Sequence, residues 1–396
     1  MQRNPQENPQ ENPQAFTGFA PRLAAFYATL FAALGVQLPF LPVWLAAKGL
    51  DAETIGLVLA VPMVVRVFAI PLATRAADRR DALRAALIIA GLLAVAGYGG
   101  LALSDGPLAI MAVYACAAAA YGAMMLLADA YALRGLAERG SAYGPVRLWG
   151  SAAFVATSLG AGYLLEVIAP SQLIWVVFAA IVVAAAATCG LLPLAPRDHA
   201  AAQALPGTKL LREPAFVAVV AAASLIQASH AVYYGFATLA WQADGLDGRL
   251  IGALWALGVL AEIALFAVSA RLPAMAPTFL LLLGAAGALL RWTAMAFGPP
   301  AAALPALQCL HALSFAATHL GALSFIARTV PVQLGATAQG YLAIAVGLAM
   351  AGGMALSGVL YARYGSFAYA AMAGAALLGG GCALAAHRLR GGDAGR

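Results

Sequence analysis

The chain has 396 residues, of which 63% are hydrophobic and only 10% are charged, and its mean hydropathy is +0.87. Soluble domains are about 25% charged, so this chain has too few polar residues to cover a water-facing surface, and the lipid bilayer is its expected solvent. The net charge of +6 is scattered between apolar segments and does not form the basic patch of a nucleic-acid-binding protein.

The chain begins with a short polar repeat, MQRNPQENPQENPQ. The repeat lacks the apolar core of a signal peptide, and proline among polar neighbours cannot build a packed core. We expect residues 1–18 to form a disordered tail.

Twelve apolar stretches follow, and each is long enough to cross a bilayer, which takes about 20 helical residues. The first six lie at about 20–43, 53–74, 83–104, 107–131, 146–168 and 172–193. The other six lie at about 215–241, 250–270, 276–297, 301–327, 334–360 and 366–388. The sequence therefore predicts an all-α membrane protein with twelve transmembrane helices, arranged as six-helix bundles at 19–194 and 215–390 around a cytoplasmic loop at 195–214.

Basic residues are concentrated in alternate loops, and cytoplasmic loops carry the excess of arginine and lysine. With the amino terminus inside, the cytoplasmic side holds Arg75, Arg79, Arg80, Arg84, Arg134, Arg139, Arg147, Arg197, Lys209, Arg212, Arg388, Arg390 and Arg396. The opposite side holds Lys48, Arg249 and Arg363. We expect a multi-pass protein of a bacterial-type cytoplasmic membrane, monomeric, with both termini in the cytoplasm.

Several ionisable residues lie inside the predicted spans, where a charge costs about 2.5–3.5 kcal/mol on insertion scales and usually faces a cavity or a partner. They are Arg66, Asp129, Arg147, Glu262 and Arg291, with the histidines His230, His311 and His319. Helical spacing groups four of them with other residues in three stripes of the second half: Gln227, His230, Tyr234, Thr238 and Trp241; Trp255, Glu262 and Ser269; Gln308, His311, Phe315 and His319. These stripes predict the wall of a central cavity, although Arg66, Asp129, Arg147 and the histidines also suit structural roles.

Other chemistries leave no motif in the sequence. There is no GxxxxGK[ST] for ATP hydrolysis and no HExxH, and the four cysteines are isolated from one another, without the spacing of a metal site or a disulfide framework. We expect neither enzyme activity nor a metal or cofactor.

Five segments resemble a known family: YGPVRLWGSAAFV (143–155), HAVYYGFATLAWQADG (230–245), LWALGVLAEIALFAVS (254–269), LLRW (289–292) and LQCLHALSFAATHL (307–320). With the six-plus-six pattern, they resemble the major facilitator superfamily, and within it the phenylpropionate permease group, which is related to the lactose permease-like proton symporters. The resemblance runs from about residue 22 to 388.

The resemblance implies roles for particular residues. Glu262, His311 and Asp129 match positions that serve proton coupling, and Asp78 and Arg79 match a conformational latch in the loop after the second span. Two departures weaken the match: the glycines of the latch signature are absent from PLATRAADRRDALR, and Ser314 stands where the pattern has a carboxylate one turn after the histidine.

The predicted function is proton-coupled uptake of a small organic acid, with aromatic acids as one class, by alternating access around a site near the membrane midplane. The predicted substrate-binding residues are Tyr27, Arg66, Arg147, Gln227, His230, Tyr234, Trp241, Trp255, Arg291 and His319. The alternatives are a sugar or nucleoside proton symporter, a drug efflux pump and, from another class, a membrane sensor or assembly factor that transports nothing.

Overall fold

The computed structural model describes residues 18–195, 207–269 and 275–393, and these ranges form helices joined by short connections, with no strand among them. The first set of helices comprises α2 (Phe19–Ala47), α3 (Ala52–Arg79), α4 (Leu83–Ala102), α5 (Pro107–Ala137), α6 (Tyr143–Leu164) and α7 (Leu173–Cys189). The second set comprises α8 (Pro214–Ala228), α9 (Ala231–Ala243), α10 (Gly248–Ser269), α11 (Pro277–Ala296), α12 (Leu304–Cys309), α13 (Thr318–Thr329), α14 (Gly335–Tyr364) and α15 (Tyr369–Asp393). The predicted tail and most of the predicted central loop lie outside the described residues.

The all-helical membrane fold is confirmed, and the number of spans is consistent with twelve. Ten described stretches are long and apolar enough to cross a membrane. One of these, Gly335–Arg390, contains both α14 and α15, which are separated by the turn η6 (Gly365–Ala368). Helix α6 has 22 residues but is not among the ten, because it carries Tyr143, Arg147 and several serine and threonine residues.

Two predicted spans are interrupted helices rather than continuous ones. The span at 215–241 is divided into α8 and α9, with a turn at Ser229 and His230. The span at 301–327 consists of the short helix η3 (Ala301–Ala303), α12, a π-helical segment η4 (Ala312–Ala317) and α13. The apolar pattern predicts a membrane crossing but does not show where the helix within it is broken.

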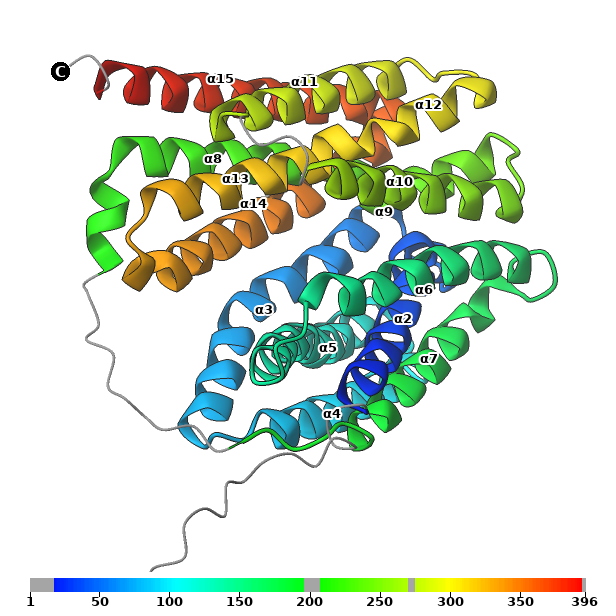
Figure 1. Ribbon diagram of the computed structural model, residues 1–396. Coiled ribbons are helices and arrows are strands. Elements are labelled where there is room, and N and C mark those ends of the chain that lie inside the picture. Colours follow the sequence, from blue (N-terminus) through cyan, green and yellow to red (C-terminus); the bar gives the residue numbers. More distant parts are fainter. Residues whose placement is uncertain (1–17, 196–206, 270–274, 394–396) are drawn as a thin grey trace, which may run out of the picture.

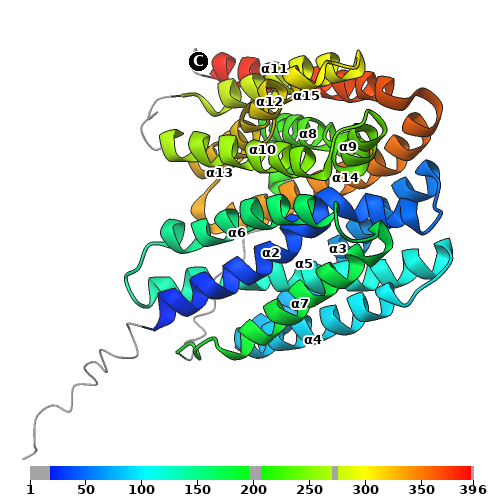
Figure 2. The ribbon, with the colours of Figure 1, turned by 90° about the vertical axis from the view of Figure 1, so that its right-hand side faces the viewer.

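The two sets lie one above the other, and α2 and α6 face α9 and α10 where the sets meet (Figure 1). Turned by 90°, the molecule shows the same two layers, with α2 and α6 at the upper surface of the first set (Figure 2). Helix α3 also packs against α14 of the second set. In Figure 1 the sets diverge on the side where α3 ends and α8 begins.

Glycines allow the backbones of the two sets to touch at one end, which carries the connections after α2, α6, α9 and α14 and is called the closed end below. A Cβ atom added to Gly358 would lie 2.6 Å from the carbonyl oxygen of Ala52 and 3.1 Å from Cα of Gly56. A Cβ atom on Gly162 would lie 3.2 Å from Cα of Gly252. With the orientation predicted from the arginines, the closed end faces outward and the sets diverge toward the cytoplasm.

The closed end should therefore open when a side chain is forced between α3 and α14. We expect Gly358→Leu to favour the opposite conformation, because its side chain would overlap the backbone of α3. The measurement is labelling of a cysteine at cavity residue Val259, in a background without the native cysteines, by an impermeant thiol reagent added outside. Gly352→Leu, on the same helix but with no atom within 4 Å of its Cβ position, is the control; equal labelling of the two variants would contradict the prediction.

Candidate functional site

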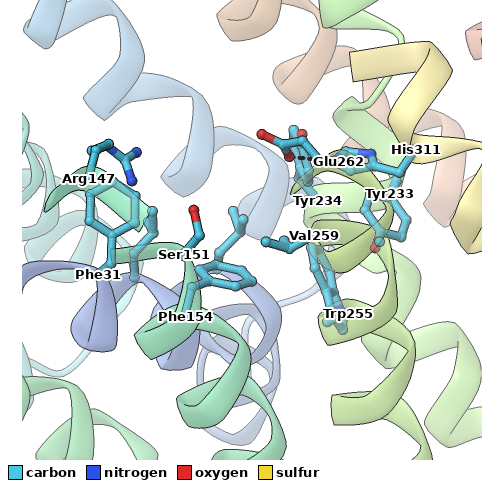
Figure 3. A pocket seen from close by; sticks show the side chains of 13 residues that line it. Phe31, Arg147, Ser151, Phe154, Tyr233, Tyr234, Trp255, Val259, Glu262 and His311 are labelled. Atoms are coloured by element: carbon cyan, nitrogen blue, oxygen red, sulfur yellow. Dashed lines mark ion pairs between the residues drawn. The ribbon is translucent and has the colours of Figure 1, made fainter. Parts of the chain in front are cut away.

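A cavity of about 140 Å³ lies between the two sets of helices. Its walls come from α2 and α6 on one side and from α9, α10 and the start of η4 on the other (Figure 3). The lining residues are Phe31, Leu34, Leu38, Arg147, Ser151, Phe154, Tyr233, Tyr234, Trp255, Gly258, Val259, Glu262 and His311.

The wall formed by the first set carries one cation on an aromatic and apolar surface. The guanidinium of Arg147 lies 3.8 Å from the ring centroid of Phe31, an arrangement that favours a cation through the ring's negative face. Ser151 and Phe154 follow Arg147 at helical spacing and line the same cavity. In Figure 3 these side chains stand opposite the aromatic residues of the other wall.

The opposite wall is a packed group of aromatic rings. Tyr233 stacks on Trp255 with ring centroids 4.4 Å apart, and Tyr234 stacks on Trp255 at 6.2 Å. The indole N–H of Trp255 donates to Thr238 over 3.0 Å, so its only polar atom is satisfied inside the wall. The faces of these rings give the cavity a fixed surface suited to a flat apolar group.

Glu262 and His311 place a carboxylate and an imidazole side by side on this wall. Their nearest atoms, Oε2 of Glu262 and Nε2 of His311, are 3.8 Å apart (Figure 3). Arg291 donates to Nδ1 of His311 over 3.0 Å; since a guanidinium can only donate, the hydrogen of a neutral His311 ring lies on Nε2. The imidazole therefore presents an N–H toward Glu262, which also interacts electrostatically with Arg147 across the cavity.

Arg291 itself is fully buried behind the cavity wall. Besides His311, it donates to Oε1 of Gln308 over 2.6 Å, and the same oxygen accepts from the Tyr233 hydroxyl over 2.9 Å. Its guanidinium lies 4.4 Å from the ring centroid of Tyr233 and 4.6 Å from that of Trp292. No carboxylate in the described part of the chain forms an ion pair with it, so Glu262 is connected to Arg291 through His311 and not directly.

Most of the predicted stripe on α8 and α9 faces other helices of the second set rather than the cavity. His230 is fully buried, and its Nε2 accepts from the Ser314 hydroxyl over 3.0 Å. Gln227 donates to the carbonyl of Phe315 over 3.4 Å, and Trp241 packs against Tyr233. From that stripe, Tyr234 is the residue that lines the cavity.

Apart from Arg147, the predicted substrate-binding and proton-coupling residues of the first set lie in two places outside the cavity lining. Asp129 accepts hydrogen bonds from the hydroxyls of Tyr27 over 2.6 Å and Tyr143 over 2.8 Å. Arg66 packs against α5, where a Cβ atom on Gly122 would overlap its guanidinium.

The remaining predicted residues lie away from the cavity lining. His319 is exposed and its ring is parallel to that of Phe315, 6.4 Å away. Arg79 is exposed near the end of α3, and the side chain of Asp78 lies outside the described residues. In the same loop the structure pairs Asp81 with Arg134 of α5, a contact that the sequence analysis did not anticipate.

Several lining residues were missed from the sequence: Phe31, Leu34, Leu38, Ser151, Phe154, Gly258 and Val259. A signal existed for Ser151 and Phe154, which lie four and seven residues after Arg147 and therefore on its face of the helix. The apolar residues of α2 gave no comparable signal, because any membrane helix is apolar all round.

No group of three or more histidine, cysteine, aspartate or glutamate side chains within 18–195, 207–269 and 275–393 is arranged to hold a metal ion.

Two sets of membrane helices around a cavity that is closed at one end form the architecture of a membrane transporter. The chain belongs to the MFS_1 like family of the major facilitator superfamily, whose family model matches residues 21–371. It is 32% identical over 368 residues to a protein of Escherichia coli (strain K12) named probable 3-phenylpropionic acid transporter, covering 90% of this chain and 94% of that protein. It is also 34% identical over 166 residues to the maltose permease of Geobacillus stearothermophilus, covering 41% of each chain.

Solved structures share the fold at low sequence identity. The nucleoside transporter NupG has a TM-score of 0.80 at 16% identity and is covered over 98% of its length, with 93% of this chain. A bacterial homologue of the human lysosomal transporter Spinster, in an inward-facing and unoccupied conformation, has a TM-score of 0.75 at 13% identity, with 96% of this chain and 98% of that one covered. The predicted major facilitator fold is thereby confirmed, and the chain is a secondary transporter.

Gln308 should be needed to keep Arg291 in place. In Gln308→Leu, Arg291 and the Tyr233 hydroxyl lose a buried acceptor, so we expect the free energy of unfolding to fall by about 1–3 kcal/mol. Thermal unfolding of the purified protein in detergent measures the change. Gln308→Glu retains the acceptor and adds a negative charge beside Arg291; a loss of stability as large as that of Gln308→Leu would show that the contact with Arg291 is not what matters.

Proposed function

We propose that this protein couples the movement of a proton to the uptake of a small aromatic carboxylic acid. The observation that carries the proposal is the pair of cavity walls: a guanidinium held on Phe31 faces a stack of aromatic rings that also bears Glu262 beside His311. The name of the Escherichia coli relative, which refers to 3-phenylpropionic acid, supports an aromatic acid as the substrate class.

Arg147 is the proposed anchor of the substrate carboxylate. It lines the cavity, whereas Arg291 is fully buried and already donates to His311 and Gln308. The hydroxyl of Ser151, one turn further along α6, can donate to the same carboxylate. The substrate ring would then lie against Trp255 and Phe154, where the cavity offers apolar and aromatic surface.

Glu262 is the proposed proton carrier, with His311 assisting it. When ionised, Glu262 attracts Arg147 across the cavity and would repel a substrate carboxylate placed between them. Protonation removes that repulsion and frees Arg147 for the substrate, so proton binding and anion binding favour each other. The Nε2–H of His311, which Arg291 orients, can bond to the ionised carboxylate and so stabilise the state from which the proton has left.

Other predicted residues have a structural role in this proposal, because each of them packs or forms hydrogen bonds within its own half. Tyr27, Asp129 and Arg66 support the first half, residues 19–194, and His230, Gln227 and Trp241 support the second, residues 215–390. The two halves rock as units about the cavity in a bacterial-type cytoplasmic membrane, with both termini in the cytoplasm and the protein acting as a monomer.

Replacing Arg147 should weaken binding of an aromatic acid. Arg147→Gln removes a charge-assisted hydrogen bond worth about 1.5–3 kcal/mol, so the Kd for 3-phenylpropionate should rise about 10- to 100-fold. Arg147→Lys should recover only part of the affinity, because an ammonium cannot make the two-pronged contact. Isothermal titration calorimetry measures the affinities, with maltose and uridine as neutral competitors.

Arg249, which lies over the ring of Tyr163 outside the cavity lining, provides a matched control, and Arg249→Gln should bind normally. Unchanged affinity of Arg147→Gln for 3-phenylpropionate would refute the anchor. Tighter binding of maltose or uridine than of 3-phenylpropionate to the unmodified protein would favour the sugar or nucleoside alternative.

Glu262→Gln should separate transport from proton coupling. Glutamine imitates the protonated carboxyl, so the variant should exchange labelled 3-phenylpropionate across proteoliposome membranes but should not accumulate it in response to a pH gradient. Glu213→Gln, an exposed acid directly before α8, should behave like the unmodified protein. Full gradient-driven accumulation by a well-folded Glu262→Gln variant would exclude Glu262 as the proton carrier.

A further inference from the structure

The packing of α6 against α10 shows which residues of the two cavity walls lie at the same depth. Helix α6 ends at the closed end and α10 begins there, so the two helices run in opposite directions. A Cβ atom on Gly252 would lie 2.5 Å from the carbonyl oxygen of Ser158, and one on Gly248 would overlap the carbonyl oxygen of Gly162. A step of four residues forward on α10 therefore corresponds to a step of four residues backward on α6.

Continued along both helices, this pairing places the lining residues in matched layers. Phe154 of α6 and Trp255 of α10 form the layer nearest the closed end, and Arg147 and Glu262 form the layer furthest from it. In Figure 3 the first pair stands in the lower part of the cavity and the second pair in the upper part. On each helix the two layers are seven residues apart, which is about 10 Å of helix. The cavity thus has a charged end and an aromatic end.

The aromatic end offers a ligand no hydrogen-bonding side chain. Phe154 is a hydrocarbon, and the only polar atom of Trp255 donates to the hydroxyl of Thr238, which is buried. The hydroxyl of Tyr233, whose ring stacks on Trp255, donates to Gln308 behind the wall. Among the described residues that line this end, each polar side-chain atom is already used within the protein.

Helix α2 completes the aromatic end with another apolar side chain. A Cβ atom on Gly35 would lie 2.6 Å from the carbonyl oxygen of Phe154, and Leu38 follows three residues nearer to the closed end. The hydroxyl of Ser151 lies on the other side of Phe154, between the two layers of α6. A ligand that extends from Arg147 toward the closed end therefore passes a hydroxyl group first and then reaches a purely apolar surface.

We propose that the cavity holds an aromatic acid in one orientation, with its ring at the aromatic end, and that this end selects rings without a hydroxyl group. The inference rests on the proposed function and narrows its substrate class. A hydroxyl on the ring position furthest from the acid chain would lose its hydrogen bonds to water and find no side-chain partner. Thr238 and Gln308 contribute to this selection from outside the cavity, because they occupy the polar atoms of the rings that line it.

Three acids test the selection and the orientation in the unmodified protein: 3-phenylpropionate, 3-(4-hydroxyphenyl)propionate and 3-(2-hydroxyphenyl)propionate. Isothermal titration calorimetry should give a Kd for the 4-hydroxy acid that is about 10- to 100-fold higher than for 3-phenylpropionate, the effect of burying one hydroxyl without a partner. The 2-hydroxy acid should lose less affinity, because its hydroxyl lies nearer to the depth of Ser151. Equal affinities for 3-phenylpropionate and the 4-hydroxy acid would refute the selection, and equal losses for the two hydroxy acids would refute the orientation.

Leu38→Asn places a hydrogen-bonding side chain at the aromatic end and should reverse part of the selection. The ratio of the Kd of the 4-hydroxy acid to that of 3-phenylpropionate should fall about tenfold, because the ring hydroxyl gains one hydrogen bond. Leu38→Met, an apolar exchange that nearly conserves volume, is the matched control and should keep the ratio of the unmodified protein. An unchanged ratio in a Leu38→Asn variant that still binds 3-phenylpropionate would contradict the position assigned to the ring.

The same measurements separate this inference from the proposed function. If 3-phenylpropionate and the 4-hydroxy acid bind the unmodified protein equally well, the proposed function stands and only the selection is wrong. If neither acid binds, both are wrong. The comparison of the three acids needs no variant, so it decides the selection even where Leu38→Asn does not fold.

Discussion

A permanent positive charge buried in the membrane is the constraint around which the second set of helices is arranged. Arg291 is fully buried and has no carboxylate partner among the described residues. Its charge is stabilised instead by neutral acceptors on His311 and Gln308 and by the ring faces of Tyr233 and Trp292. A buried charge is tolerated only when such contacts are well placed, so this one residue fixes the relative positions of α9, α11, α12 and the start of η4.

The same arrangement sets the chemistry of the cavity wall. Because Arg291 occupies one nitrogen of His311, the other nitrogen faces Glu262 as a donor. The fixed charge therefore lies behind the wall, the carboxyl group proposed to exchange the proton lies at its surface, and the cation available to a substrate, Arg147, lies on the opposite wall. In the proposed cycle, a carboxylate substrate and Glu262 compete for Arg147, which makes coupling a consequence of the electrostatics between two walls.

The contact between the two sets of helices is made through glycines, whereas two spans of the second set are interrupted. At the closed end, Gly358 and Gly162 bring backbones of the two sets into contact. Within the second set, a turn at Ser229 and His230 interrupts one helix, and a π-helical segment interrupts another. A hydrogen bond between His230 and Ser314 joins these two interrupted helices. The ring of His230 also lies next to that of His311, which is proposed to assist proton exchange.

The sequence by itself determined that the chain folds in a lipid bilayer, that its fold is all-helical and that it belongs to the major facilitator superfamily. Long apolar stretches with so few charges can satisfy backbone hydrogen bonds in lipid only as helices, and the segments around Arg147, Glu262 and His311 were distinctive enough to indicate the family. It also identified the charged residues inside the spans, since a charge there is costly wherever it points.

The tertiary structure alone decided which of them share a cavity: Arg147, Glu262 and His311 line it, whereas Arg291 lies behind it and Asp129 is bound by Tyr27 and Tyr143. Helical spacing places residues on a common face but does not show what that face meets. The hydrogen bond that links His230 to Ser314 of η4 likewise depends on a neighbouring helix, which no pattern within one span can reveal.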